Sequence, residues 1–125
     1  MRGVDDDLIA SVFARDCASR GVLADITGRW GTLALAALHE GSLRFNALRR
    51  RVDGVSEKML AQTLQALERD GLVRREVQAT IPPRVEYSLT DLGARVAAKL
   101  VELIELVEGE IGTARQAQEA YDRAR

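Results

Sequence analysis

Residues 56–93 read SEKMLAQTLQALERDGLVRREVQATIPPRVEYSLTDLG. Ser56 is a good N-cap and Gly71 is a good C-terminal stop, so this stretch begins with a helix that runs to about Asp70. The apolar residues of that helix recur at i, i+4 and i+7, a spacing that places them on one face and predicts that the face points into a core. They are Leu60, Leu64 and Leu67.

Two strand-like runs follow this helix, at 72–77 and 84–88. Pro82 and Pro83 cannot donate hydrogen bonds to a strand ladder, so we place them at the rim of a hairpin between the two runs. Thr90 then caps another helix. The succession of helix, hairpin and helix predicts a mainly α fold with a small antiparallel β-hairpin. It is the layout of a winged helix-turn-helix, which indicates contact with DNA.

Further segments precede this stretch. Helical spacing is present over 6–15, over 19–27 and over the Ala-rich residues 31–39. A stub of strand at 43–44 and a short helix over 45–52 then lead to an Asp-Gly turn signal. The apolar positions of the first helix are Leu8, Ile9, Val12 and Phe13.

The helix that begins at Thr90 is expected to run to residue 112 and carries two neighbouring apolar seams. An apolar arc of this width exceeds what one small domain needs. Residues 113–125 are polar and are expected to form a tail that frays. The first seam comprises Val96, Leu100, Leu103 and Val107, and the second comprises Val101, Ile104 and Ile111.

The bulk composition excludes several classes of protein. A chain of 125 residues with 46% apolar and 30% charged residues suits one globular domain. No apolar run approaches the roughly 18 residues that cross a bilayer, and the acidic start of the chain is unlike a signal peptide, so we expect a cytoplasmic protein that does not enter membranes. Cys17 and His39 are the only residues of their kinds, which predicts no internal disulfide, no metal site and no cofactor. Without a nucleophile–base pair or a phosphate loop we expect no enzyme.

Charge is distributed unevenly along the chain. The net charge is only −1, but residues 44–84 hold nine Arg and Lys against five Asp and Glu, whereas residues 1–43 hold four against six. A basic middle behind an acidic start is the footprint of a DNA-binding face, although a charge run can also be no more than a solvated surface.

The second helix of a helix-turn-helix enters the major groove and reads base edges from its first turns. With the three leucines inward, Gln62 and Gln65 point outward and suit adenine edges, and Lys58 suits guanine or phosphate. Ser56 and the amides at this helix start can hold a phosphate, and the arginines at 49–51 add backbone contacts. The candidate DNA-binding residues are Arg44, Arg49, Ser56, Lys58, Met59, Ala61, Gln62, Thr63, Gln65 and Arg84.

The chain resembles the HxlR family of bacterial winged-helix regulators, which are relatives of the MarR-type regulators, from Cys17 to about Val96. Several blocks match in the right order, and the run from Pro82 to Thr90 is highly specific. The matching blocks are Cys17, Gly28-Arg29-Trp30, Leu43-Arg44-Phe45, Leu48-Arg49, Gly54-Val55-Ser56, Lys58, Leu60, Leu64, Leu67-Glu68, Asp70-Gly71-Leu72-Val73, Pro82-Pro83-Arg84-Val85-Glu86-Tyr87-Ser88-Leu89-Thr90 and Leu92-Gly93.

This resemblance implies a homodimeric transcription factor that binds double-stranded DNA at a pseudo-palindromic operator, with repression as the expected outcome. Residues 1–125 then form one domain, with the winged helix-turn-helix over 19–88, the recognition helix over 56–70 and the wing over 73–88. Dimerisation in the family uses the N-terminal segment and the helix after the wing, here 6–15 and 90–112. The implied interface residues are Leu8, Ile9, Val12, Phe13, Val96, Leu100, Leu103 and Val107.

The recognition helix departs from the family pattern. Ala61, Thr63 and Gln65 stand where the family often has Thr, Arg and Arg. A less basic helix predicts a different operator or a weaker electrostatic affinity. It is also the one feature that favours the rival interpretation, a winged-helix protein-interaction module that has lost DNA binding.

Two kinds of signal are open. In several family members the cysteine at the position of Cys17 senses oxidants or electrophiles, and Cys17 precedes a helix start, where a thiolate is favoured. The alternative role for this residue is that of a small buried hydrophobe. The second kind of signal is a small apolar ligand between Trp30, the 31–39 helix and the dimer helices, although a Trp at such a position is more often part of the core.

Overall fold

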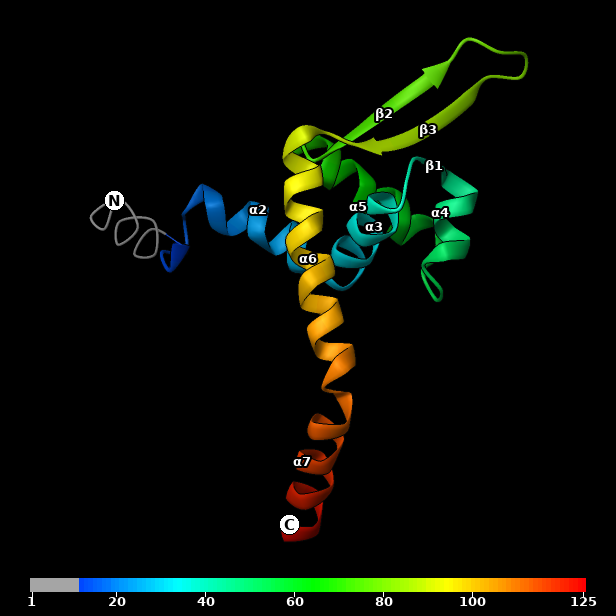
Figure 1. The fold of residues 1–125 in the computed structure, drawn as a ribbon. Helices are drawn as coiled ribbons and strands as arrows, with labels where there is room; N and C mark the ends of the chain where they lie inside the picture. The colour runs from blue at the N-terminus through cyan, green and yellow to red at the C-terminus, as the bar shows by residue number, and fades with distance from the viewer. Residues whose placement is uncertain (1–11) are drawn as a thin grey trace.

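The computed structural model describes residues 12–125, and Figure 1 shows that the last two helices extend one after the other beyond the rest of the fold. Leu8 and Ile9, and with them most of the helix expected over 6–15, lie outside the described residues. The described elements are α2 (Ala18–Thr27), α3 (Arg29–His39), β1 (Leu43–Arg44), α4 (Phe45–Arg51), α5 (Glu57–Arg69), β2 (Val73–Gln78), β3 (Arg84–Leu89), α6 (Asp91–Gly109) and α7 (Ile111–Ala124). The mainly helical winged helix-turn-helix expected from the sequence is confirmed.

The core forms around α3, which packs against α2, α4, α5, α6 and β3. The Ala-rich sequence of α3 allows this close approach from several sides, and Ala34 and Leu35 are fully buried. From α5 come the three leucines predicted to face inward, and from α6 come Ala97 and Leu100. We refer to this packed unit, residues 18–100, as the body.

The sheet is antiparallel and has the strand order β1-β3-β2. The wing hairpin pairs Val73 with Leu89 at its base and Gln78 with Arg84 at its tip. Pro82 and Pro83 lie in the loop that joins the two strands, as expected of residues that cannot donate to the ladder. Figure 1 shows that this hairpin projects away from the body, so its outer half is open to a partner.

A close backbone contact joins the end of α5 to the start of α6. Gly71 has φ +78° and ends α5, as its position after Asp70 predicts. The Thr90 hydroxyl donates to the Gly71 carbonyl oxygen at 2.6 Å and accepts from the Gly93 amide at 3.0 Å. A Cβ at Gly93 would collide with the Leu72 carbonyl, so only glycine permits this approach.

The C-terminal end differs from the sequence expectation. The helix expected to end at 112 ends at Gly109, and residues 113–125, expected to be a fraying tail, continue as α7. Ala, Arg, Gln and Glu, which favour helices, make up most of this segment, and the Thr113 hydroxyl donates to Glu110 Oε1 at its start. The polar character expected of residues 113–125 agrees with the structure, because no residue of α7 is buried within the described chain. No helix among residues 12–125 has the length and apolar character needed to span a membrane.

Candidate nucleic-acid interface

The outward face of α5 is polar and accessible. Ser56 caps the helix, its Oγ accepting from the Met59 amide at 3.1 Å, while the inward leucines are at most 1% exposed. This anchoring fixes the rotation of α5 about its axis, and therefore which side chains face outward. Of those named from the sequence, Lys58, Met59, Gln62 and Gln65 are exposed, and Ala61 and Thr63 are half-buried.

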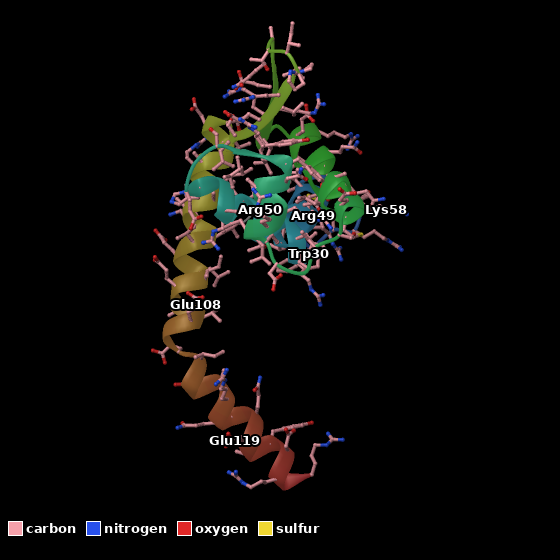
Figure 2. The ribbon with its side chains drawn as sticks, turned by 90° about the vertical axis from the view of Figure 1, so that its right-hand side faces the viewer. Trp30, Arg49, Arg50, Lys58, Glu108 and Glu119 are labelled. Atoms are coloured by element: carbon pink, nitrogen blue, oxygen red, sulfur yellow. The ribbon has the colours of Figure 1, made fainter. Side chains whose placement is uncertain are left out.

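Arg49 on α4 lies beside the start of α5. Its Nη1 atom is 3.6 Å from Glu57 Oε1, and both side chains are largely exposed. A surface pair of this kind contributes little stability, so Arg49 can exchange Glu57 for a phosphate at small cost. Figure 2 shows Arg49 and Lys58 on the body, well away from Glu108 and Glu119 on the C-terminal helices.

A second group of basic residues lies between the β1–α4 segment and the wing. A groove of about 1060 Å³ lies there, and its fourteen lining residues include three arginines, Arg44, Arg50 and Arg84, and one acid, Glu86. Arg44 is paired in register with Glu86, which stands two residues from Arg84 on β3. The sheet thus brings Arg44 and Arg84 together from positions forty residues apart in the sequence. This clustering suits contacts to a sugar–phosphate backbone.

Arg51 is bound to an acidic side chain of the same chain. It therefore differs from the expectation that all three arginines at 49–51 contact the DNA backbone. Its guanidinium donates to both carboxylate oxygens of Glu40, at 2.9 and 2.7 Å. This bidentate pair lowers the pKa of Glu40, chiefly through the hydrogen bonds, and raises the pKa of Arg51. The sequence held no signal for it, because the two residues lie on different elements.

A carboxylate pair lies beneath the end of α5. Asp70 is half-buried, and its Oδ2 atom is shielded from solvent without a hydrogen-bond partner among residues 12–125. Burial raises the pKa of Asp70, and the neighbouring Asp25 carboxyl on α2 raises it further, while Arg69 opposes the shift. Only the packing of α2 on α5 creates this pair, so sequence reasoning missed it.

Cys17 and Trp30 lie away from the α5 surface. Cys17 is half-buried at the N-cap position of α2, and Arg20 in the first turn donates to the Phe13 carbonyl oxygen at 3.3 Å. Trp30 packs partly buried against the core, with the Arg29 guanidinium 5.6 Å from its ring centroid. A hollow of about 520 Å³ lies between α3 and α6, lined by Leu33, Val101 and Ile104 among others, but Trp30 is not one of its walls.

The residues expected at a dimer interface are found in different environments. Leu100 is buried in the body and Val96 is half-buried, whereas Leu103 and Val107 are 54% and 53% exposed. Val12 is half-buried and Phe13 is 76% exposed. Among residues 12–125, no three His, Cys, Asp or Glu side chains gather as metal ligands do.

Comparison with known proteins places this arrangement among regulators. Residues 25–114 match the family model described as HxlR-like helix-turn-helix. The chain is 54% identical over 98 residues to YtfH of Escherichia coli, described as an uncharacterized HTH-type transcriptional regulator, covering 78% of each chain. Its structure is similar to that of the transcriptional regulator ytfH from Salmonella typhimurium (TM-score 0.81, 49% identity, 86% of this chain and 96% of that one). It is also similar to the redox regulator HypR in its oxidized form (TM-score 0.68, 35% identity, 74% of this chain and 96% of that one).

Proposed function

The chain belongs to the HxlR-like helix-turn-helix family of transcriptional regulators, and we propose that it represses transcription by binding a pseudo-palindromic operator as a homodimer. The family consists of regulators, not enzymes. The observation that carries the proposal is the orientation of α5, whose leucines are buried while Lys58, Gln62 and Gln65 are exposed beside a basic α4. A regulator of this kind acts in the cytoplasm, where its operator lies.

In the proposed complex the first turns of α5 enter the major groove. Gln62 and Gln65 contact adenine edges, and Lys58 contacts a guanine or a phosphate. Met59, Ala61 and Thr63 lie at the margin of the same surface and contact bases through their apolar atoms. Ser56 and the amides at the start of α5 that Ser56 does not cap hold a backbone phosphate.

Positioning contacts come from the arginines around α5. Arg49 binds a phosphate next to the helix start, and Arg44 and Arg84 bind the backbone or the minor groove beside the wing. Since α5 itself is less basic than the family pattern, we expect few phosphate contacts. A salt titration measures their number, because each contact adds about 0.9 to the slope of log affinity against log salt. A steep slope would contradict the weak-affinity interpretation.

The test of the function is binding to the DNA upstream of the protein's own gene. We expect selective binding there in a fluorescence anisotropy assay, and Lys58→Ala or Gln62→Ala to weaken it by about tenfold or more. The matched controls are Lys99→Ala and Gln116→Ala, which remove the same side chains from exposed positions on α6 and α7. Absence of binding at low salt would favour the rival function, a protein-interaction module built on the same fold.

Cys17 is the proposed site of signal input. Its place at the N-cap of α2 favours the thiolate, and similarity to the redox regulator HypR supports an oxidant or electrophile as the signal. With one cysteine per chain, the products are a disulfide between subunits, a mixed disulfide with a small thiol, or an alkylated thiol. We expect diamide to change operator binding of the wild type and not of Cys17→Ser. An equal response of both proteins would exclude Cys17 as the sensor.

The hollow between α3 and α6 supports a second candidate signal, a small apolar ligand. Six of its twelve lining residues are apolar, among them Leu33, Val101 and Ile104, and the other six are charged residues or His39. The hollow lies where the body meets the expected dimer helix. Ile104→Trp would fill the hollow. If this variant keeps its operator binding and also its response to effectors in cells, the hollow is not the effector site.

A further inference from the structure

The hollow between α3 and α6 has walls from three parts of the chain. Two small residues, Ala36 and Ala37, lie on its α3 side and leave room between the packed helices. Val52, which follows α4 and is buried, contributes to a third side. The resulting space of about 520 Å³ is within the range of small-molecule sites.

The wall that α6 contributes changes character along the helix. Its four lining residues are spaced at i, i+3, i+4 and i+7, so they share the face of α6 that lies against α3. Val101 and Ile104 are half-buried, whereas Glu105 and Glu108 are exposed. Figure 2 shows Glu108 on the part of α6 that continues beyond the body. The inner part of this wall is therefore apolar and its outer end is acidic.

The polar side chains around the hollow are mostly carboxylates. Four of them line it together with a single guanidinium, that of Arg51, and His39 is the other polar residue of the lining. The Arg51 guanidinium is already held by two hydrogen bonds to Glu40. Within residues 12–125, no ion pair joins the other three carboxylates to a cation. They are those of Asp53, Glu105 and Glu108.

We propose that the hollow binds a small organic cation with an apolar body, the body between α3 and α6 and the charged head among the carboxylates of Asp53, Glu105 and Glu108. The inference rests on the second candidate signal of the proposed function and gives its ligand a positive charge. Carboxylates without a cation partner attract such a head and repel an anion. A neutral ligand would gain only from the apolar walls.

The hollow and the expected dimer surface use different residues of α6. Val101 and Ile104 belong to the second apolar seam, whereas the residues implied at the dimer interface lie on the first. Among the described residues, none of those implied at the interface lines the hollow. The proposed ligand site is therefore separate from the dimer surface that the family resemblance implies.

The position of the hollow connects a ligand to the DNA surface. Val52 and Asp53 line it and belong to the connection between α4 and α5. A cation that draws Asp53 towards Glu105 and Glu108 would shift this connection against α6. Because the connection leads directly into α5, we expect a change in operator affinity when the cation binds.

The experiment compares three probes that share one apolar body and differ in charge. They are 4-phenylbutylammonium, 4-phenylbutanol and 4-phenylbutanoate. Isothermal titration calorimetry on the full chain, at low salt, measures the dissociation constant of each. We expect the cation to bind about tenfold or more tightly than the anion, with the alcohol between them. Ile104→Trp, which fills the hollow, should lose all three.

A charge variant tests the acidic end of the hollow. The double variant Glu105→Gln with Glu108→Gln keeps the shape of the lining and removes two carboxylates. It should lose most of the preference for the cation and keep its affinity for the alcohol. The matched control is Glu102→Gln, an exposed glutamate of α6 outside the lining, which should keep the preference.

The same proteins are titrated with operator DNA, with and without 4-phenylbutylammonium. The cation should change the operator affinity of the wild type by roughly fivefold or more, and that of the double variant much less. An unchanged operator affinity of the wild type would overturn the coupling of the hollow to α5.

Other outcomes overturn the ligand site itself. Equal binding of the three probes, or tighter binding of the anion, would overturn the proposed charge selectivity. No binding of any probe at millimolar concentration, or unchanged binding by Ile104→Trp, would show that the hollow is not a ligand site. Operator binding measured without a probe is independent of these results. Its absence would contradict the proposed function, even in a chain that selects the cation.

Discussion

The recognition helix α5 and the arm formed by α6 and α7 are both amphipathic, yet they differ in what covers their apolar faces. The leucines of α5 are at most 1% exposed because α3 and β2 of the same chain pack against them. Leu103 on the arm is 54% exposed. An amphipathic pattern therefore predicts that a face will be covered, but it does not predict which chain covers it. The four variants below test this contrast.

The largest loss of folding stability is expected from a substitution inside the body. Leu64→Ala removes a side chain that is 1% exposed, so it should lower the free energy of unfolding by about 2–5 kcal/mol. Urea unfolding followed by circular dichroism measures the loss. Because the covering side chains belong to the same chain, the loss should be equal at low and high protein concentration. A loss that varies with concentration would break the contrast between α5 and the arm.

On the arm, the corresponding change is Leu103→Ala. It should weaken dimerisation by roughly tenfold, which corresponds to about 1.4 kcal/mol. Sedimentation equilibrium measures the dimer dissociation constant, with the exposed Glu102→Ala as control. An unchanged dissociation constant would show that Leu103 is not at the interface.

A smaller change in the free energy of unfolding, here a gain in stability, is expected where α2 meets α5. The pKa of Asp70 is raised in the folded protein, so its contribution to stability is present at acid pH and is lost as the pH rises through that raised value. Asp70→Asn should therefore stabilise the protein at neutral pH by about 1 kcal/mol and leave it unchanged in acid. Thermal unfolding across a pH series measures the difference. Destabilisation at neutral pH would indicate that the charged form of Asp70 is needed.

The smallest change in stability is expected from a substitution of Glu40, at the edge of the body. Glu40→Gln removes the carboxylate that holds Arg51, but the pair is exposed and screened by solvent. Because the pKa of Glu40 is lowered in the folded protein, the pair stabilises it at neutral pH and this contribution is lost as the pH falls. We expect a slight drop in melting temperature at low salt that disappears at high salt. Operator binding should not fall, since Arg51 lies outside the proposed DNA surface.

Local signals in the sequence were sufficient for most of the elements. The bounds of α5 follow from Ser56 and Gly71, and the wing follows from the two strand-like runs around Pro82-Pro83. The apolar pattern predicts that α3 starts at 31, two residues after its observed start at Arg29, because Gly28 both ends α2 and opens α3. The polarity of residues 113–125 favours a fraying tail, whereas their helix propensity favours the helix α7 that the structure shows.

The candidate interface was predictable as far as it depends on one helix. The rotation of α5 follows from three leucines, and so does the choice of Lys58, Gln62 and Gln65. The cluster of Arg44 with Arg84, the pairing of Arg51 with Glu40 and the contact of Asp70 with Asp25 depend on how separate elements pack. No spacing along the chain encodes those contacts.

The sequence by itself determined the order of most elements, the inner and outer faces of α5 and the amphipathic character of α6, because hydrophobic periodicity and capping act over a few residues. Only the tertiary structure decided that Gly93 must lie against the Leu72 carbonyl, that Arg51 is bound by Glu40, and that the apolar seam stays open beyond Leu100. These features arise from contacts between residues far apart in the chain, where the geometry of the whole fold sets each distance.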